Sequence, residues 1–169
     1  IRVVNQKCIR SGSRIDYSLA RRNDLSKKAV NKDLLIRPGD ILINSTGTGT
    51  LGRTALVREV DEPTTFDSHV TLVRPKSSVD GGFLGYFMLN SEDILVLESR
   101  GSTNQIELSQ NTVSWLELPL PSLDEQRRIA DYLDEETSRI DNTKATATEL
   151  REELIARRKA IITEYVTGQ

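Results

Sequence analysis

The sequence predicts an α+β fold in which a globular, mostly-β domain with short helices is followed by one long coiled-coil helix. Short apolar and β-branched runs, separated by glycine and proline turns, occur throughout residues 1–120 and are typical of strands. Residues 122–167 contain neither proline nor glycine, and apolar residues recur there at seven-residue steps, which is typical of a coiled coil. We therefore expect a globular domain over residues 1–121 and a long helix over residues 122–169.

The globular domain is expected to form a twisted, mostly antiparallel sheet with a few helices, and its first half is expected to contribute short strands joined by loops. Residues 1–4 are a β-branched run, and the turn sequence Arg-Pro-Gly-Asp at 37–40 leads into the apolar residues 41–43. A loop of serine, threonine and glycine at 45–52 separates this run from another at 54–57. The two runs are therefore predicted to pair as a hairpin.

The second half of the domain combines strands and helix. Residues 70–73 are an apolar run that predicts a strand. Residues 82–97 carry an apolar stripe at helical spacing, which Asn-Ser at 90–91 can interrupt. Residues 99–112 are polar and loop-like, and the alternation at 115–118 predicts a last strand.

The long helix begins with a capping box, in which the side chains of Ser122 and Glu125 each bond the amide of the other. About 45 residues extend roughly 67 Å, more than a domain of this size can bury. We expect the helix to pair with another helix or subunit; the alternative is a helix bent back onto its own domain. The residues expected at the pairing seam are Ile129, Leu133, Ile140, Ala147, Leu150, Leu154 and Ile161.

The composition excludes several classes of protein. The one cysteine, Cys8, cannot form an internal disulfide, and with a single histidine, His69, it cannot build a zinc site of the usual type. No apolar run approaches the length of a membrane span, and no basic-then-apolar leader opens the chain. Because the chain starts at Ile1, we expect a fragment or internal domain of a longer protein, in a reducing cytoplasmic setting.

The charge is distributed unevenly along a chain whose net charge is −2. Residues 1–58 contain twelve lysines and arginines against four acidic residues, whereas residues 59–120 contain three against ten. A basic first third on a nearly neutral chain indicates a surface that faces an anion. The alternative is that folding scatters these charges over a solvated surface.

No catalytic motif stands out. The loop 45–52 matches the glycine spacing of the dinucleotide fingerprint, but strand-like residues follow it where that fingerprint needs a helix. His69 adjoins Asp67 and Ser68, yet neighbours on a strand point to opposite faces and do not make a triad. We expect His69 to be structural or exposed and Cys8 to be buried. The acidic residues at 61–67 lack the lysine pattern of a nuclease.

Two segments have the side chains that recognise DNA bases. Asparagine and glutamine can contact adenine edges, and arginine and lysine can contact guanine; residues 5–10 and 100–105 carry this chemistry. The hydroxyls and bare amides of loop 45–52 suit a phosphate backbone. The alternative is that these are ordinary surface loops. The residues expected to contact DNA are Asn5, Gln6, Lys7, Arg10, Arg14, Arg21, Arg22, Lys27, Lys28, Ser45, Thr46, Thr48, Arg53, Arg100, Thr103, Asn104 and Gln105.

The start and end of the long helix resemble a known family. Residues 118–133 combine Pro-x-Pro with Glu-Gln-x-x-Ile, and the helix ends in Val-Thr-Gly at 166–168. This arrangement resembles the specificity (S) subunit of type I restriction–modification enzymes. Pro-Gly-Asp-Ile-Leu at 38–42, the Leu-Gly-Arg ending at Arg53 and Gly-Ser-Thr-Asn-Gln at 101–105 resemble its target-recognition domain.

The resemblance implies recognition of one half-site in double-stranded DNA, without catalysis by this chain. A complete S subunit holds two such units, whose spacer helices pack antiparallel and set the gap between half-sites. This chain resembles one unit, from either half or from a single-unit subunit that dimerises. Glu136 and Thr143 depart from the family's more apolar seam.

The same resemblance implies partners that hold the cofactors. Methyltransferase (M) subunits would carry S-adenosylmethionine, and a restriction (R) subunit would use ATP and magnesium, so we expect no cofactor, metal or membrane contact for this chain. Two alternative functions remain open: a coiled-coil adaptor without a DNA role, and a fragment of a nuclease or methyltransferase.

Overall fold

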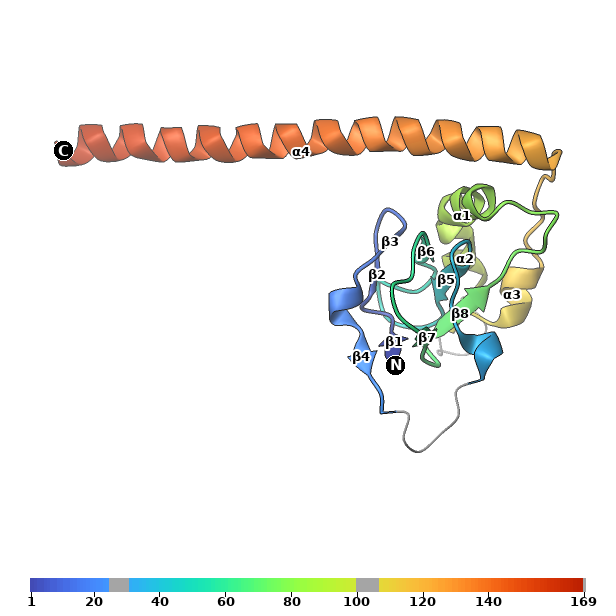
Figure 1. The fold of residues 1–169 in the computed structure, drawn as a ribbon. Coiled ribbons are helices and arrows are strands. Elements are labelled where there is room, and N and C mark those ends of the chain that lie inside the picture. Colours follow the sequence, from blue (N-terminus) through green and yellow to red (C-terminus); the bar gives the residue numbers. More distant parts are fainter. Residues whose placement is uncertain (25–30, 100–106, 169) are drawn as a thin grey trace. The chain divides into compact units, whose positions relative to one another are not determined.

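The structure is a computed structural model, and it describes residues 1–24, 31–99 and 107–168 (Figure 1). The strands are β1 (Arg2–Val4), β2 (Ile9–Arg10), β3 (Arg14–Ile15), β4 (Arg21–Arg22), β5 (Ile41–Asn44), β6 (Thr54–Leu56), β7 (Thr64–Phe66) and β8 (Val70–Val73). The helices are α1 (Gly81–Asn90), α2 (Glu92–Glu98), α3 (Gln110–Ser114) and α4 (Leu123–Thr167), with 3₁₀ turns η1 (Tyr17–Leu19) and η3 (Lys32–Leu34). These strands and helices confirm the predicted α+β class, including the long helix.

The strands form two three-stranded sheets and a hairpin, rather than the single sheet that we expected. The sheets have the orders β4-β1-β7 and β6-β5-β8, and β2 pairs with β3. Only β1 and β7 are parallel among the described pairs. The predicted hairpin of β5 and β6 is confirmed, with Leu42 opposite Ala55, and it positions the glycine loop at its tip.

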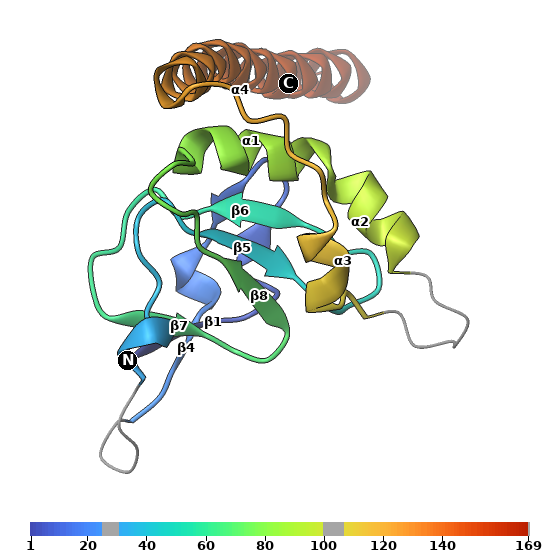
Figure 2. The same cartoon turned by 90° about the vertical axis from the view of Figure 1, so that its right-hand side faces the viewer.

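Strand β5 is buried on both faces. Ile41 and Ile43 pack in one core with Leu84 of α1, whereas Leu42 packs in the other with Val4 of β1. Successive side chains of a strand point to opposite faces, and here each face is covered, with α1 on one side (Figure 2). Covering both faces explains why this strand is continuously apolar instead of alternating.

The segment after α2 differs from our prediction. Residues 115–118 are not a strand: α3 precedes them, and Trp115 is 83% exposed. The hydroxyl of Ser109 accepts a hydrogen bond from the Thr112 amide and caps α3. This cap favours a helical turn immediately before the expected strand, and Pro119 lacks the amide that a paired strand needs.

The predicted interruption of the helix over 82–97 is confirmed, since α1 ends at Asn90 and α2 begins at Glu92. Ser91 is buried at the junction, and its hydroxyl donates to the Phe87 carbonyl 2.8 Å away. Sequence analysis did not predict strands β2, β3, β4 and β7. These strands have only two or three residues each and are largely polar, so they lack a periodic signal.

Contacts divide the chain into two compact units, Ile1–Ala130 and Asp131–Gln169. The first turns of α4 therefore belong to the first unit, where Gln126 is buried. Its Oε1 accepts from the Asp80 amide at 2.8 Å, and its Nε2 donates to the carbonyls of Pro121 at 2.9 Å and Ser78 at 3.3 Å. The domain division at residue 121 stays a prediction.

Replacing Gln126 by alanine is expected to lower the free energy of unfolding of the first unit by about 2 kcal/mol. The substitution leaves three backbone groups without their partner, and each buried unpaired polar group is costly. Chemical denaturation followed by tryptophan fluorescence measures the effect. Gln110→Ala, at an exposed position of α3, is the matched control and should change stability by less than about 0.5 kcal/mol.

Within the described residues, no helix is long and apolar enough to cross a membrane. The same described ranges contain no group of three or more histidine, cysteine, aspartate or glutamate side chains arranged to hold a metal ion.

Candidate nucleic-acid interface

Strand ends from both sheets meet at one edge of the first unit. Because β1 and β7 are parallel, with Val4 opposite Phe66, the chain leaves both strands in the same direction. Because β5 and β8 are antiparallel, with Asn44 opposite Val70, the end of β5 adjoins the start of β8 (Figure 2). We call this region the loop edge; it comprises the turn 5–8, the glycine loop 45–53 and the turn 67–69.

Hydrogen bonds join the three segments of the loop edge. The buried side chain of Asn44 donates from Nδ2 to the carbonyl of Gln6 at 3.1 Å. The Ser45 amide donates to the carbonyl of His69 at 2.9 Å. The Leu108 amide donates to the Ser45 carbonyl at 2.8 Å, so the chain after α2 is also anchored there. These bonds fix the backbone from which the loop side chains project.

Gly47 allows the turn 5–8 to approach the glycine loop closely. Its φ is +105°, a conformation that disfavours any residue with a side chain. A Cβ at this position would collide with the hydroxyl of Thr50 and lie 2.6 Å from Oε1 of Gln6. The glycine therefore serves both the backbone turn and the placement of the Gln6 side chain above it.

Three polar side chains form a hydrogen-bonded row across the loop edge. The hydroxyl of Thr46 donates to Oε1 of Gln6 at 3.4 Å and lies 3.1 Å from Nδ1 of His69. His69 is exposed, as expected, and its amide donates to Oδ1 of Asp67 at 3.0 Å. The hydroxyl of Thr46 thus bridges Gln6 and His69, which are 63 positions apart in the sequence.

Some predicted DNA-contacting side chains are instead occupied within the fold. Asn5 is buried; it donates from Nδ2 to the carbonyl of Leu19 and accepts the Lys7 amide on Oδ1. Ser45 is also buried, and its hydroxyl is hydrogen-bonded to that of Thr71. Both side chains hold the loop edge in place.

Two predicted arginines form ion pairs at the edge strand β4. Arg21 contacts Asp67 at 2.6 Å, and Arg22 contacts Glu62 at 2.7 Å. The basic first third is therefore partly neutralised by acidic residues 40 or more positions away. Since Asp67 also holds the His69 amide, Arg21 supports the turn 67–69 from the side.

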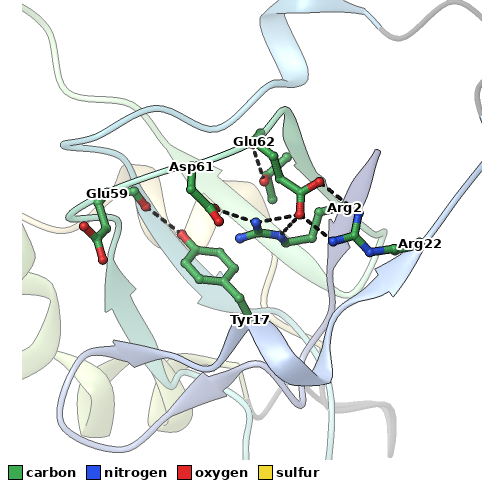
Figure 3. Close-up of polar contacts among 7 residues, drawn as sticks. Arg2, Tyr17, Arg22, Glu59, Asp61 and Glu62 are labelled. Atoms are coloured by element: carbon green, nitrogen blue, oxygen red, sulfur yellow. Dashed lines mark hydrogen bonds and ion pairs between the residues drawn. The ribbon is translucent and has the colours of Figure 1, made fainter.

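A buried arginine lies at the centre of the same charged cluster (Figure 3). Arg2, only 5% exposed, contacts Asp61 and Glu62, and its guanidinium carbon lies 4.4 Å from the centroid of the Tyr17 ring. Burial opposes its charge, but the hydrogen bonds to Glu62 and Asp61 outweigh burial and raise the pKa of Arg2. The hydrogen bond from Arg2 lowers the pKa of Asp61, and those from Arg22 and Arg2 lower the pKa of Glu62.

The hairpin of β2 and β3 presents two arginines together. Arg10 and Arg14 are directly opposite each other in the register, and both are exposed. Like charges placed opposite each other in an antiparallel pair are destabilising, and an anion bound there would relieve that repulsion. Lys7 and Thr48 are also exposed, while Arg53 donates to the Gly49 carbonyl at 3.1 Å.

Several predicted site residues lie outside the described residues: Lys27, Lys28, Arg100, Thr103, Asn104 and Gln105. Two residues that shape this site were not predicted as part of it: His69 in the loop edge, and Asn44 at the end of β5 beside it. The chemistry of His69 was visible in the sequence, but its proximity to Gln6 depends on strand pairing. Asn44 gave no signal beyond its position at the end of an apolar run.

Cys8 is buried, as expected, and burial raises the pKa of its thiol.

The second unit exposes an apolar stripe. Leu154 is 56% and Ile161 47% exposed, and Leu154 shares one surface of the helix with Ala147, Leu150 and Ile155, flanked by Arg151 and Arg158. Four of the predicted seam residues, Ile140, Leu150, Leu154 and Ile161, are among the exposed large apolar residues, whereas Ile129 and Leu133 are half-buried. Exposed apolar patches are typical of interaction surfaces, so the pairing of this helix stays a prediction.

Comparisons with known proteins identify the family. The family described as the type I restriction modification DNA specificity domain matches residues 4–152. The specificity subunit of type I restriction enzyme StySPI from Salmonella potsdam is 27% identical over 147 residues, covering 84% of this chain and 31% of the relative. The EcoKI specificity subunit from Escherichia coli (strain K12) is 26% identical, with coverages of 85% and 31%. The chain thus spans less than a third of the length of these curated relatives.

Solved structures agree with the fold. The HsdS subunit from Thermoanaerobacter tengcongensis superimposes with a TM-score of 0.67 at 19% identity, covering 90% of this chain and 39% of that one. A chain from a structural study of complex assembly and conformational transition of the type I R-M system gives a TM-score of 0.64 at 25% identity, covering 77% and 31%. Because the family match extends over most of the sequence, this chain belongs to the type I restriction modification DNA specificity domain family.

Proposed function

We propose that this chain recognises a short base sequence in double-stranded DNA through its loop edge. The observation that carries the proposal is the convergence of the turn 5–8, the glycine loop and the turn 67–69 in a member of a DNA specificity family. Base recognition requires several polar side chains held in a fixed geometry. The hydrogen bonds from Asn44 and Ser45 supply that rigidity.

The recognised sequence is proposed to be one half-site of a longer target. The match covers 31% of the length of each of the two curated relatives, which fits a single recognition unit. The apolar stripe of α4 would pair with the helix of a second unit, or of a second copy, and so set the distance between half-sites. Recognition would direct methyltransferase subunits, and indirectly a restriction subunit, in the cytoplasm.

Catalysis is assigned to those partners, because the relatives are specificity subunits. S-adenosylmethionine, ATP and magnesium would accordingly bind to the methyltransferase and restriction subunits.

Selection from a randomised duplex library tests the proposal. The chain, co-purified with its cognate methyltransferase subunit, should enrich a motif of a few base pairs. A stable complex that enriches no motif would refute sequence recognition and favour the adaptor function. Methyl transfer or cleavage by the purified chain alone would favour the enzyme fragment.

Replacing both Arg10 and Arg14 by alanine is expected to weaken DNA binding and to make it less dependent on salt concentration. Each arginine that neutralises a phosphate contributes about 0.9 to the slope of log K against log salt. We therefore expect the slope to fall by about two, with affinity reduced by about tenfold or more at low salt. Fluorescence anisotropy over a salt series measures both quantities.

The exposed Arg37 provides the matched control, because it lies outside the proposed interface. Arg37→Ala should leave the slope unchanged. An unchanged slope in the Arg10/Arg14 variant would remove the hairpin from the interface. The double variant should also be slightly more stable, since it relieves the repulsion between the two charges.

A further inference from the structure

The row formed by Gln6, Thr46 and His69 fixes which hydrogen-bonding groups remain available at the loop edge. Oε1 of Gln6 can only accept, so the one hydroxyl hydrogen of Thr46 points to it. When the hydroxyl donates to Gln6, Nδ1–H of the imidazole donates in turn to the hydroxyl oxygen across the 3.1 Å contact between Thr46 and His69. This arrangement corresponds to the Nδ1–H tautomer of the His69 ring.

Two complementary groups remain unused by this row. In the Nδ1–H tautomer, Nε2 of His69 is an acceptor. The carboxamide of Gln6 still has its NH₂ group, which is a donor. His69 is exposed and Gln6 half-buried, and both side chains contact the same hydroxyl. The row therefore offers one donor and one acceptor from neighbouring side chains.

We propose that Gln6 and His69 act as a pair that recognises a single adenine in the major groove. Adenine presents an acceptor, N7, beside a donor, the N6 amino group. The Gln6 amide would donate to N7, and Nε2 of His69 would accept from N6. Guanine presents two acceptors at this edge, so the His69 acceptor would have no partner there. The inference rests on the proposed DNA recognition and names one base contact within it.

Thr46 is the positioning residue of this pair, since its hydroxyl contacts both side chains and, by donating to Gln6, favours the Nδ1–H tautomer of His69. Gly47 contributes by leaving room for the Gln6 carboxamide. Removing the Thr46 hydroxyl frees the imidazole to adopt either tautomer and uncouples the two groups. The preference for adenine should then fall even though Gln6 and His69 are still present.

The test compares enriched motifs from the randomised duplex library, using the complex with the methyltransferase subunit. Gln6→Leu and His69→Ala should each lose the preference for adenine at the same single position, by about tenfold or more, while the other positions are retained. Thr46→Val should weaken that position, whereas Thr46→Ser, which restores the hydroxyl, should retain it. Gln110→Leu, on the exposed surface of α3, is the matched control.

The outcomes separate the inference from the proposed function. The pair would be overturned, and the proposed function retained, if the wild-type complex enriches a motif that neither Gln6→Leu nor His69→Ala alters. The same conclusion would follow if the two substitutions alter different positions of the motif. Equal behaviour of Thr46→Val and Thr46→Ser would overturn the bridging role. Failure of the wild-type complex to enrich any motif would overturn the proposed function together with the pair. Circular dichroism of each variant confirms that the fold is retained.

Discussion

Replacing Arg2 by alanine is expected to lower the free energy of unfolding of the first unit by about 3 kcal/mol. Its guanidinium is buried against Tyr17 and bonded to Asp61 and Glu62. Breaking a buried ion pair by removing one partner typically costs 3–5 kcal/mol. The cost here should lie at the lower end, because Asp61 remains in contact with water. Urea denaturation at neutral pH measures the change.

Arg22→Ala is the matched control for this substitution. Arg22 bonds the same carboxylate of Glu62, but its side chain is 72% exposed, and exposed ion pairs contribute about 0–1 kcal/mol. A loss as large as that of Arg2→Ala would show that burial is not what makes the Arg2 contacts strong.

The same cluster makes stability depend on pH. The pKa values of Asp61 and Glu62 are lowered in the folded chain, so the folded state favours their charged forms. The resulting stability is fully present above the ordinary carboxylate pKa of about 4 and is lost as the pH falls through the lowered values. Arg2→Ala should therefore reduce the loss of unfolding free energy that occurs as the pH is lowered. The same loss in the variant as in the wild type would contradict the role of the cluster.

Replacing Leu154 by glutamate is expected to abolish pairing of α4 with a second helix. The side chain is half-exposed in the single chain and lies on the same surface of the helix as Ala147 and Leu150. Burying a leucine contributes about 1.5–3 kcal/mol, and in a two-fold symmetric pair the loss counts twice. A charge placed in the seam adds desolvation. The association constant should consequently fall by at least about a hundredfold.

Sedimentation equilibrium of the complete chain measures this association. Glu152→Gln, which changes an exposed residue outside the seam, is the control and should leave the association constant within about threefold. If the apparent mass of the Leu154→Glu variant still rises with concentration as it does for the wild type, the pairing surface lies elsewhere on the helix.

The sequence was sufficient for the elements that have a strong local signal. The hairpin of β5 and β6 was predictable because apolar runs flank a glycine loop, and α4 because nothing interrupts it for 45 residues. Residues 115–118 misled us, since a four-residue alternation also arises in an irregular segment. Strand β4 consists only of Arg21 and Arg22, and its pairing with β1 is a tertiary event without a local pattern.

The sequence was sufficient to predict the chemistry of the candidate site, but not which residues belong to it. We predicted that Arg22 contacts DNA, but in the fold it is hydrogen-bonded to Glu62, which is 40 positions away in the sequence. Asn5 had base-recognising chemistry, yet its carboxamide stabilises a turn. Conversely, His69 became a neighbour of Gln6 only because β1 and β7 run parallel. Charge and side-chain type are local properties, whereas the accessibility of a group depends on the whole fold.

The exposure of several loop-edge side chains has a consequence for protein engineering. Val4, Asn44 and Val70 hold the strand ends from buried positions, while Gln6, Thr48 and His69 project from segments that are at least partly exposed. Exposed side chains on those segments can be exchanged without repacking either core, provided that Gly47 and the buried residues Asn5, Cys8, Ser45 and Leu51 are kept. The scaffold is thus suited to combinatorial libraries, in which new target preferences are selected on an unchanged frame.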